Sequence, residues 1–289
     1  MISGIVNVLK PPGMTSHDVV SFIRKSYGLK KVGHAGTLDP AAAGVLPVFL
    51  GVATRLIEYT QDANKAYQAE ITFGYATDSG DDTGRVIQEA KDVALPSQNQ
   101  LEVVLRSFTG PVTQVPPMYS AIKIGGKKLY ELARQGIIID RQPRHIMIHK
   151  MALLRFVENK ALFSVECSKG TYIRTLCMDI GEQVGCPAVM SFLVRTRVGS
   201  FHLKDAKTLE EIAAEAQAAL LPMEHAIKHL PLAVLKEDAS KAFKNGRSVD
   251  FETQLQETVY RVYDQEGRFI GIGQRKSGDL GLAPAKVLA

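Results

Sequence analysis

The sequence has no tryptophan, only three cysteines among 289 residues, and no apolar run near the roughly 20 residues that a membrane-spanning helix needs. The cysteines, Cys167, Cys177 and Cys186, are too few for a disulfide framework and form no CxxC motif. The first residues lack the basic segment and cleavage site of a signal peptide. From these absences we expect reduced thiols and a cytoplasmic protein without contact to a membrane.

Several motifs that carry chemistry are also missing. The sequence has no P-loop, no GxGxxG after a strand, no HExxH and no GxSxG. Asp78, Asp82 and Glu89 follow part of the spacing of a calcium-binding loop, but Gly80 and Thr83 stand where that loop needs an oxygen ligand and a glycine. A polar turn is therefore expected there, and no metal site is predicted.

Charge and composition are moderate. Lysine and arginine number 35 against 30 acidic residues, which gives a net charge of +5 and a pI near 9.0. This mild excess permits a polyanionic partner without requiring one. Hydrophobic residues make up 45% and charged residues 22%, so the chain can bury a sizeable core in one large domain or two unequal ones.

Hydrophobic periodicity predicts both strands and helices. Strands are expected at 4–9, 45–50, 67–75, 153–157 and 162–167, and helices at 16–27, 53–60, 101–108, 128–135 and 173–184. The order shows no strict alternation of strand and helix. It favours an α+β fold built on a mixed, largely antiparallel sheet.

A domain boundary is expected near two prolines, Pro222 and Pro231, which bracket a plausible linker. Beyond it, short strands are predicted at 258–263 and 269–273, a pattern typical of a small all-β module. We therefore predict two domains, residues 1–225 and residues 231–289.

The segment from Gly33 to Pro40, Gly-His-Ala-Gly-Thr-Leu-Asp-Pro, fits neither the helical nor the strand period. Its glycines allow unusual backbone angles, and Pro40 favours an extended backbone at Asp39. A carboxylate on a loop between structured elements is well placed to react. The same aspartate could instead cap the next element, and spacing alone leaves both readings open.

This segment resembles the motif II box of the pseudouridine synthases, and most closely that of the bacterial enzymes that act on uridine 55 in the T loop of tRNA. Further similar segments follow in the expected order, at 4–16, 65–67, 116–128 and 168–176. The C-terminal piece resembles a PUA-type RNA-binding domain, more loosely, through Gly267, Gly271 and Gly273. The resemblance implies a catalytic domain over 1–225 and a PUA-like domain over 231–289.

The implied reaction detaches uracil from its ribose, rotates it and rejoins it through carbon, so pseudouridine forms without redox change and no cofactor is required. Asp39 matches the essential aspartate of the family, and Arg174 matches the residue that pairs with it. From the sequence alone, Arg174 could equally be a surface residue of a helix.

The resemblance also implies that the target base is flipped out of the RNA. Tyr67 matches a tyrosine that stacks on this base, Tyr172 lies in the same pocket, and His34 matches a histidine inserted where the base was. Leu193 matches an apolar pocket residue, although Leu193 and Tyr67 could instead be core residues. Basic residues that could contact phosphate, or simply be solvated, are Lys10, Lys123, Lys127, Lys128, Arg141 and Arg144.

The expected partner is tRNA, bound through its T stem-loop by a monomer that needs no partner protein and has an accompanying tRNA-folding role. Two other classes remain to be weighed. An RNA-binding protein without turnover is disfavoured because both Asp39 and Arg174 are present. A metal-dependent nuclease would need several convergent carboxylates, and the motif loop supplies only Asp39.

Overall fold

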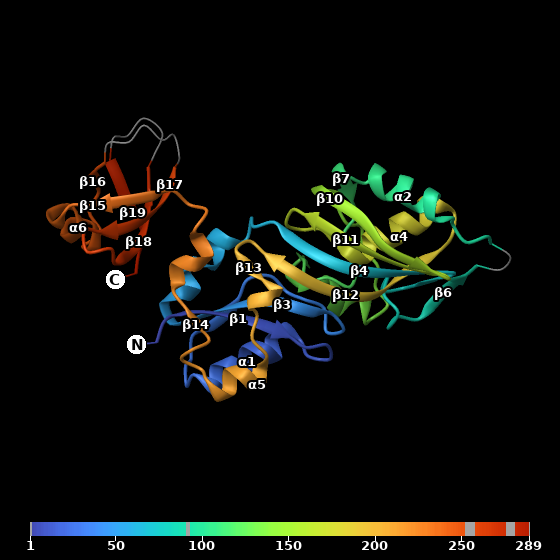
Figure 1. Ribbon diagram of the computed structural model, residues 1–289, viewed down its shortest axis with the longest axis horizontal. Coiled ribbons are helices and arrows are strands. Elements are labelled where there is room, and N and C mark those ends of the chain that lie inside the picture. Colours follow the sequence, from blue (N-terminus) through green and yellow to red (C-terminus); the bar gives the residue numbers. More distant parts are fainter. Residues whose placement is uncertain (1, 91–92, 252–257, 276–280, 289) are drawn as a thin grey trace.

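The computed structural model of the chain describes residues 2–90, 93–251, 258–275 and 281–288. Two sheets organise these residues, a ten-stranded sheet within 4–221 and a five-stranded sheet within 232–287 (Figure 1). The smaller sheet lies at one end of the long axis of the molecule, next to the chain termini. The predicted α+β class is confirmed.

The large sheet has the strand order β14-β1-β3-β12-β4-β11-β10-β7, with β2 paired to β3 and β13 to β12. All of its pairings are antiparallel except the short parallel contact between β12 and β3. Its strands are β1 (Gly4–Lys10), β2 (Val32–His34), β3 (Ala43–Leu50), β4 (Lys65–Phe73), β7 (Gly110–Gln114), β10 (Arg144–Val157), β11 (Lys160–Cys167), β12 (Ala188–Val198), β13 (Phe201–His202) and β14 (Leu220–Leu221).

Local sequence signals explain where the main helices begin and end. Capping boxes at Thr15, Ser97 and Thr208 open α1 (Ser16–Ser26), α2 (Gln98–Ser107) and α5 (Leu209–Ala214). Gly185, with a φ of 76°, ends α4 (Ile173–Val184) in the left-handed conformation. The remaining elements of this part are η1 (Gly51–Thr60), α3 (Leu129–Ala133), η2 (Leu203–Asp205), η3 (Met223–Ile227) and the hairpins β5–β6 (Tyr75–Thr77, Val86–Glu89) and β8–β9 (Lys123–Ile124, Lys127–Lys128).

Helices cover the large sheet in two groups, each with its own core. Helices α2 and α4 pack against β4, β10, β11 and β12 through buried residues such as Leu105, Leu176 and Phe163. Helices α1 and α5 pack against β1 and β3 through residues such as Val19 and Ile212. In the described residues no helix is both long and apolar enough to cross a membrane.

The smaller sheet has the order β15-β17-β18-β19-β16 and its own apolar core around Phe243, Tyr260 and Val262. Gly271 is required in β18, since a Cβ there would lie 2.0 Å from the carbonyl oxygen of Lys286. The strands are β15 (Leu232–Leu235), β16 (Val249–Asp250), β17 (Val259–Asp264), β18 (Phe269–Gln274) and β19 (Gly281–Val287), and α6 (Glu237–Lys244) is a helix that the sequence analysis did not expect.

The two sheets share an apolar cluster at their junction. Leu56 of η1 and Ile227 of η3 belong to the same cluster as Ile272 and Leu288 of the C-terminal part. Arg55 Nη1 also donates a hydrogen bond of 2.7 Å to the carbonyl of Val287. The boundary predicted between residues 225 and 231 thus falls at a packed junction, and the independence of the two parts stays a prediction.

Three expected elements differ in the structure. Segment 53–60 belongs to a 3-10 helix instead of an α-helix, the strand expected at 67–75 ends at Phe73, and the helix expected at 128–135 spans only Leu129–Ala133. Strand β12 was not anticipated because Ser191, Arg195 and Arg197 interrupt its apolar pattern.

We predict that a chain ending at His229 folds but melts several degrees below the full chain. The truncation removes Ile272 and Leu288 from the junction cluster, which also contains Phe49 of the large sheet, and leaves the other two cores of that sheet intact. Thermal melting followed by circular dichroism, with binding of an apolar dye as a second readout, tests this against the full-length chain. An insoluble product without a cooperative transition would show that the large sheet does not fold without the C-terminal sheet.

Candidate active site

The loop between β2 and β3 carries Asp39 and has almost no regular backbone pairing of its own. Its polar groups are instead satisfied by side chains from neighbouring elements, as buried backbone groups must be. Ser16 of α1 accepts a hydrogen bond of 2.9 Å from the Leu38 amide and donates one of 3.2 Å to the Leu38 carbonyl. Ser16 therefore holds the backbone of the residue directly before Asp39.

Two cations complete this support. Lys10 Nζ donates to the carbonyls of Pro11, Pro40 and Ala42 at 2.8, 3.1 and 2.7 Å. The Arg195 guanidinium donates to three further carbonyls, of which Gly36 and Thr37 precede Asp39 and Val45 follows it.

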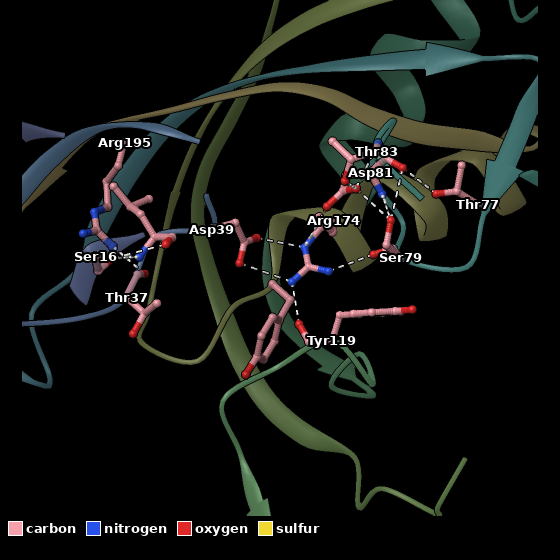
Figure 2. Close-up of polar contacts among 12 residues, drawn as sticks. Ser16, Thr37, Asp39, Thr77, Ser79, Asp81, Thr83, Tyr119, Arg174 and Arg195 are labelled. Carbon is pink, nitrogen blue, oxygen red and sulfur yellow. Dashed lines mark hydrogen bonds and ion pairs between the residues drawn. The ribbon is translucent and has the colours of Figure 1, made fainter. Parts of the chain in front are cut away.

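Asp39 forms an ion pair with Arg174 of the first turn of α4 (Figure 2). The Nε–Oδ2 distance is 2.9 Å and the Nη2–Oδ1 distance is 3.4 Å, which is a fork-like, two-point contact. Arg174 is only 5% exposed, whereas Asp39 is 38% exposed. The Asp39 carboxylate is thus held by a buried guanidinium and is itself partly exposed to solvent.

Arg174 is held by two other segments as well. Its Nη1 donates to the Ser79 carbonyl at 2.8 Å and its Nη2 to the Tyr119 carbonyl at 2.7 Å. The Oδ2 atom of Asp81 lies 3.8 Å from Nε. Oδ1 of Asp81 accepts from the Ser79 hydroxyl and from the amide and hydroxyl of Thr83, so the expected polar turn is present and also provides a second carboxylate for Arg174.

Tyr67 and Leu193 lie on the adjacent strands β4 and β12 and belong to the same buried cluster as Leu38. Each is 7% exposed. Burial raises the pKa of the Tyr67 phenol to about 12, although the guanidinium of Arg195 opposes this rise. The phenol is therefore neutral at physiological pH, and only a small part of the Tyr67 side chain is exposed.

Tyr172 occupies the cap position before α4 and is clamped by a side chain of β7. Gln114 donates from Nε2 to the Tyr172 carbonyl at 3.1 Å and accepts from the Tyr172 amide at 2.8 Å. These two hydrogen bonds between the Gln114 side chain and the Tyr172 backbone fix the start of the helix that carries Arg174. Burial raises the pKa of the Tyr172 phenol.

His34 lies on β2, where it pairs with Val48 of β3, and its side chain is half-buried. Burial lowers the pKa of the imidazole, and the positive charge of Arg195 lowers it further. The ring is consequently neutral at physiological pH.

The lysines expected to contact phosphate fall into two groups. Lys127 and Lys128 form β9 of the predicted hairpin, with Lys127 exposed and Lys128 Nζ donating to the Tyr130 hydroxyl at 3.2 Å. Lys10 differs from these two, because its side chain is fully buried and its ammonium donates to backbone carbonyls of the Asp39 loop. Burial also lowers the pKa of its ammonium to about 8.

Three residues of this site were not singled out by the sequence analysis: Asp81, Gln114 and Arg195. Nothing local marks them, since their importance comes from contacts with segments more than 50 residues away. Among the residues that the structure describes, no group of three or more His, Cys, Asp or Glu side chains is arranged to hold a metal ion.

Comparisons with protein families identify three matching regions. Residues 24–173 match the TruB family pseudouridylate synthase N-terminal domain, residues 174–228 match the tRNA pseudouridylate synthase B C-terminal domain, and residues 231–288 match the pseudouridine synthase II TruB C-terminal region.

Similar proteins agree with these matches. A tRNA pseudouridine synthase B of Alkaliphilus oremlandii is 45% identical over 99% of this chain and 98% of its own. One from Symbiobacterium thermophilum is 50% identical over 85% of this chain and 82% of its own. Among solved structures, a chain of a Cbf5-Nop10-Gar1 complex superposes with a TM-score of 0.77 at 28% identity, over 98% of this chain and 84% of that one.

We predict that Asp179→Asn stabilises the protein at pH 8 by about 1–2 kcal/mol, after allowance for solvent screening. Burial on α4 raises the pKa of Asp179 to about 6, with a further rise from Glu182. Folding therefore disfavours the charged carboxylate, and the stability of the wild type falls as pH rises from about 4 to about 6. At pH 3.5 both proteins are neutral at this position and should be equally stable.

Urea denaturation at both pH values measures the difference, with Glu102→Gln on the half-exposed side of α2 as the control for loss of one negative charge. A stabilisation of equal size at both pH values would contradict the assigned cause.

Proposed function

The chain belongs to the TruB family of pseudouridylate synthases, and on that premise we propose that it isomerises uridine 55 in the T loop of tRNA to pseudouridine. The observation that carries the proposal is the Asp39–Arg174 pair, a partly open carboxylate held by a buried guanidinium. The two-point contact with Arg174 holds the Asp39 carboxylate in one orientation, from which it can act as a nucleophile or a base.

In the proposed reaction Asp39 acts on the bond between ribose and uracil. The base detaches, turns while it stays enclosed, and rejoins its ribose through carbon. Atoms and electrons balance within the nucleoside, so no oxidant or reductant is needed. Asp39 acts as a nucleophile or a base, and the other residues bind and orient the nucleoside. Arg174 keeps Asp39 in place through this sequence because its other contacts anchor it to Ser79 and Tyr119.

A uridine inside a folded loop has to leave the base stack to reach Asp39. Tyr67 and Leu193 would form the wall against which the flipped uracil lies, and Tyr172 would close the pocket from α4. His34, neutral and flat, would fill the gap in the RNA without bringing a charge into the stack. Stacking on aromatic rings contributes about 1–3 kcal/mol per base in single-strand binders.

The RNA backbone would be bound outside this pocket. Lys127 and Lys128 lie on the β8–β9 hairpin, whose turn is formed by Gly125 and Gly126 with φ values of 58° and 83°. Residues 231–289 would form an accessory RNA-binding domain that contacts tRNA outside the T arm. We propose further that the reaction takes place in the cytoplasm and needs no partner protein.

We predict that Asp39→Asn abolishes pseudouridine formation and leaves RNA affinity within a few fold of wild type. The amide has nearly the same size as the carboxylate but can neither attack nor accept a proton. Incubation with a T-arm hairpin in the absence of metal, followed by nucleoside analysis, tests the first part, and filter binding tests the second. Asp238→Asn on α6 serves as the control.

Substantial turnover by the Asp39→Asn protein would remove Asp39 from the chemistry. Binding without turnover by the wild type on both tRNA and hairpin would favour an RNA-binding protein over an enzyme.

We predict that Lys127→Met and Lys128→Met each lower the magnitude of the salt slope of RNA affinity by about 0.7–0.9, the change expected for one lost phosphate contact. Lys10→Met is the matched comparison, because its ammonium contacts backbone carbonyls only. It should lower the melting temperature and leave the slope unchanged. Binding isotherms at several salt concentrations distinguish the two groups, and a smaller slope for Lys10→Met would restore that residue as a phosphate contact.

A further inference from the structure

The largest fully buried side chain of the described residues is a charged one, Arg195 of β12, which is 1% exposed. Within the described ranges its guanidinium forms no ion pair with a carboxylate. An arginine keeps its charge under such conditions, and taking it from water without an acidic partner costs several kcal/mol. An apolar side chain of similar length would avoid this cost.

The Arg195 guanidinium donates hydrogen bonds to the backbone of the Asp39 loop both before and after Asp39. Nη2 and Nη1 donate to the carbonyls of Gly36 and Thr37 at 3.1 and 3.2 Å, before Asp39, and Nε donates to the Val45 carbonyl at 2.8 Å, after it. Figure 2 draws this contact to Thr37 on the opposite side of Asp39 from Arg174.

The backbone of Arg195 supports the same loop. Gly44 is its parallel partner in β3, and a Cβ on Gly44 would lie 2.3 Å from the Arg195 carbonyl oxygen. The loop therefore returns to the sheet directly against this residue.

On its other side Arg195 lies next to a residue that would contact the flipped uracil. Tyr67 of β4 is its antiparallel cross-strand partner, and the positive charge of Arg195 acts on the phenol. One guanidinium thus contacts both ends of the loop that carries Asp39 and lies beside the tyrosine that would stack on uracil. Arg174 holds the Asp39 carboxylate itself, whereas Arg195 holds the backbone on which Asp39 stands.

We propose that Arg195 is a positioning residue for the isomerisation, which fixes the distance and angle between the Asp39 loop and Tyr67. Its place in the reaction rests on the proposed function, whereas its support of the loop rests on the contacts above. A lysine has one ammonium and cannot reproduce a planar fork that donates in three directions. A displacement of about 1 Å in a reacting group lowers the rate by about 100-fold.

The first test compares Arg195→Lys and Arg195→Met with Arg197→Lys and Arg197→Met. Arg197 is on the same strand but pairs with Glu166 at 2.6 Å and donates to the Gly199 carbonyl. We expect Arg195→Lys to lower kcat by about 100-fold, as a displaced reacting group would, with KM and RNA affinity within a few fold of wild type. The Arg197 variants should keep most of the wild-type kcat.

The second test does not depend on the reaction. Amide hydrogen exchange should accelerate in residues 36–45 of Arg195→Lys and stay at the wild-type rate in Arg197→Lys. If the wild type forms no pseudouridine, the proposed function fails, and hydrogen exchange still decides whether Arg195 holds the loop.

Three results would overturn the proposal. A folded Arg195→Lys protein could retain most of the wild-type kcat, or lose RNA affinity in the same proportion as kcat. Alternatively, both Arg195 variants could fail to fold, which would make the residue a requirement of folding alone.

Discussion

Burial of the Arg174 guanidinium is the constraint on which the arrangement of the site depends. A guanidinium that is almost fully removed from water needs acceptors in every direction, and it obtains them from three segments: Asp39, the turn of Ser79 and Asp81, and Tyr119. Removing any one of them would leave a buried donor unpaired, at a cost of about 1–3 kcal/mol or more. These three segments therefore meet at the N-terminal end of α4. One consequence is that the Asp39 carboxylate is held in a fixed orientation.

Strand β12 is the second element on which the site depends, because it joins the two halves of the large sheet. It pairs in parallel with β3 on one side and antiparallel with β4 on the other. A strand in this place contacts both the return of the Asp39 loop and the strand of Tyr67. Leu193 and Arg195 can therefore act on the same pocket although they come from a segment about 150 residues after the loop.

Elements encoded by short-range signals were predictable from the sequence, and those that depend on distant partners were not. The capping boxes at Thr15 and Ser97 and the glycine at 185 act within one helical turn, and the structure confirms the helices they mark. Strand β12 carries polar residues whose partners lie far away in the chain. These residues interrupt the alternation of apolar and polar side chains by which a strand is recognised in a sequence. The burial of Lys10 was not predictable for the same reason, because its acceptors Pro40 and Ala42 lie 30 and 32 residues away in the chain. The pairing of Asp39 with Arg174 came from the family resemblance, and its geometry from the structure.

The charges around Asp39 give the site a positive bias, with Arg174, Arg195 and Lys10 set against Asp39 and Asp81. Such a field favours any negative charge that develops on the detached base. Two of the three cations are arginines, whose charge does not change near neutral pH. Lys10 differs, because burial lowers its pKa to about 8. Above that pH its ammonium loses a proton and can no longer donate to Pro11, Pro40 and Ala42 together. The field at Asp39 and the support of its loop therefore weaken at the same pH and through the same side chain.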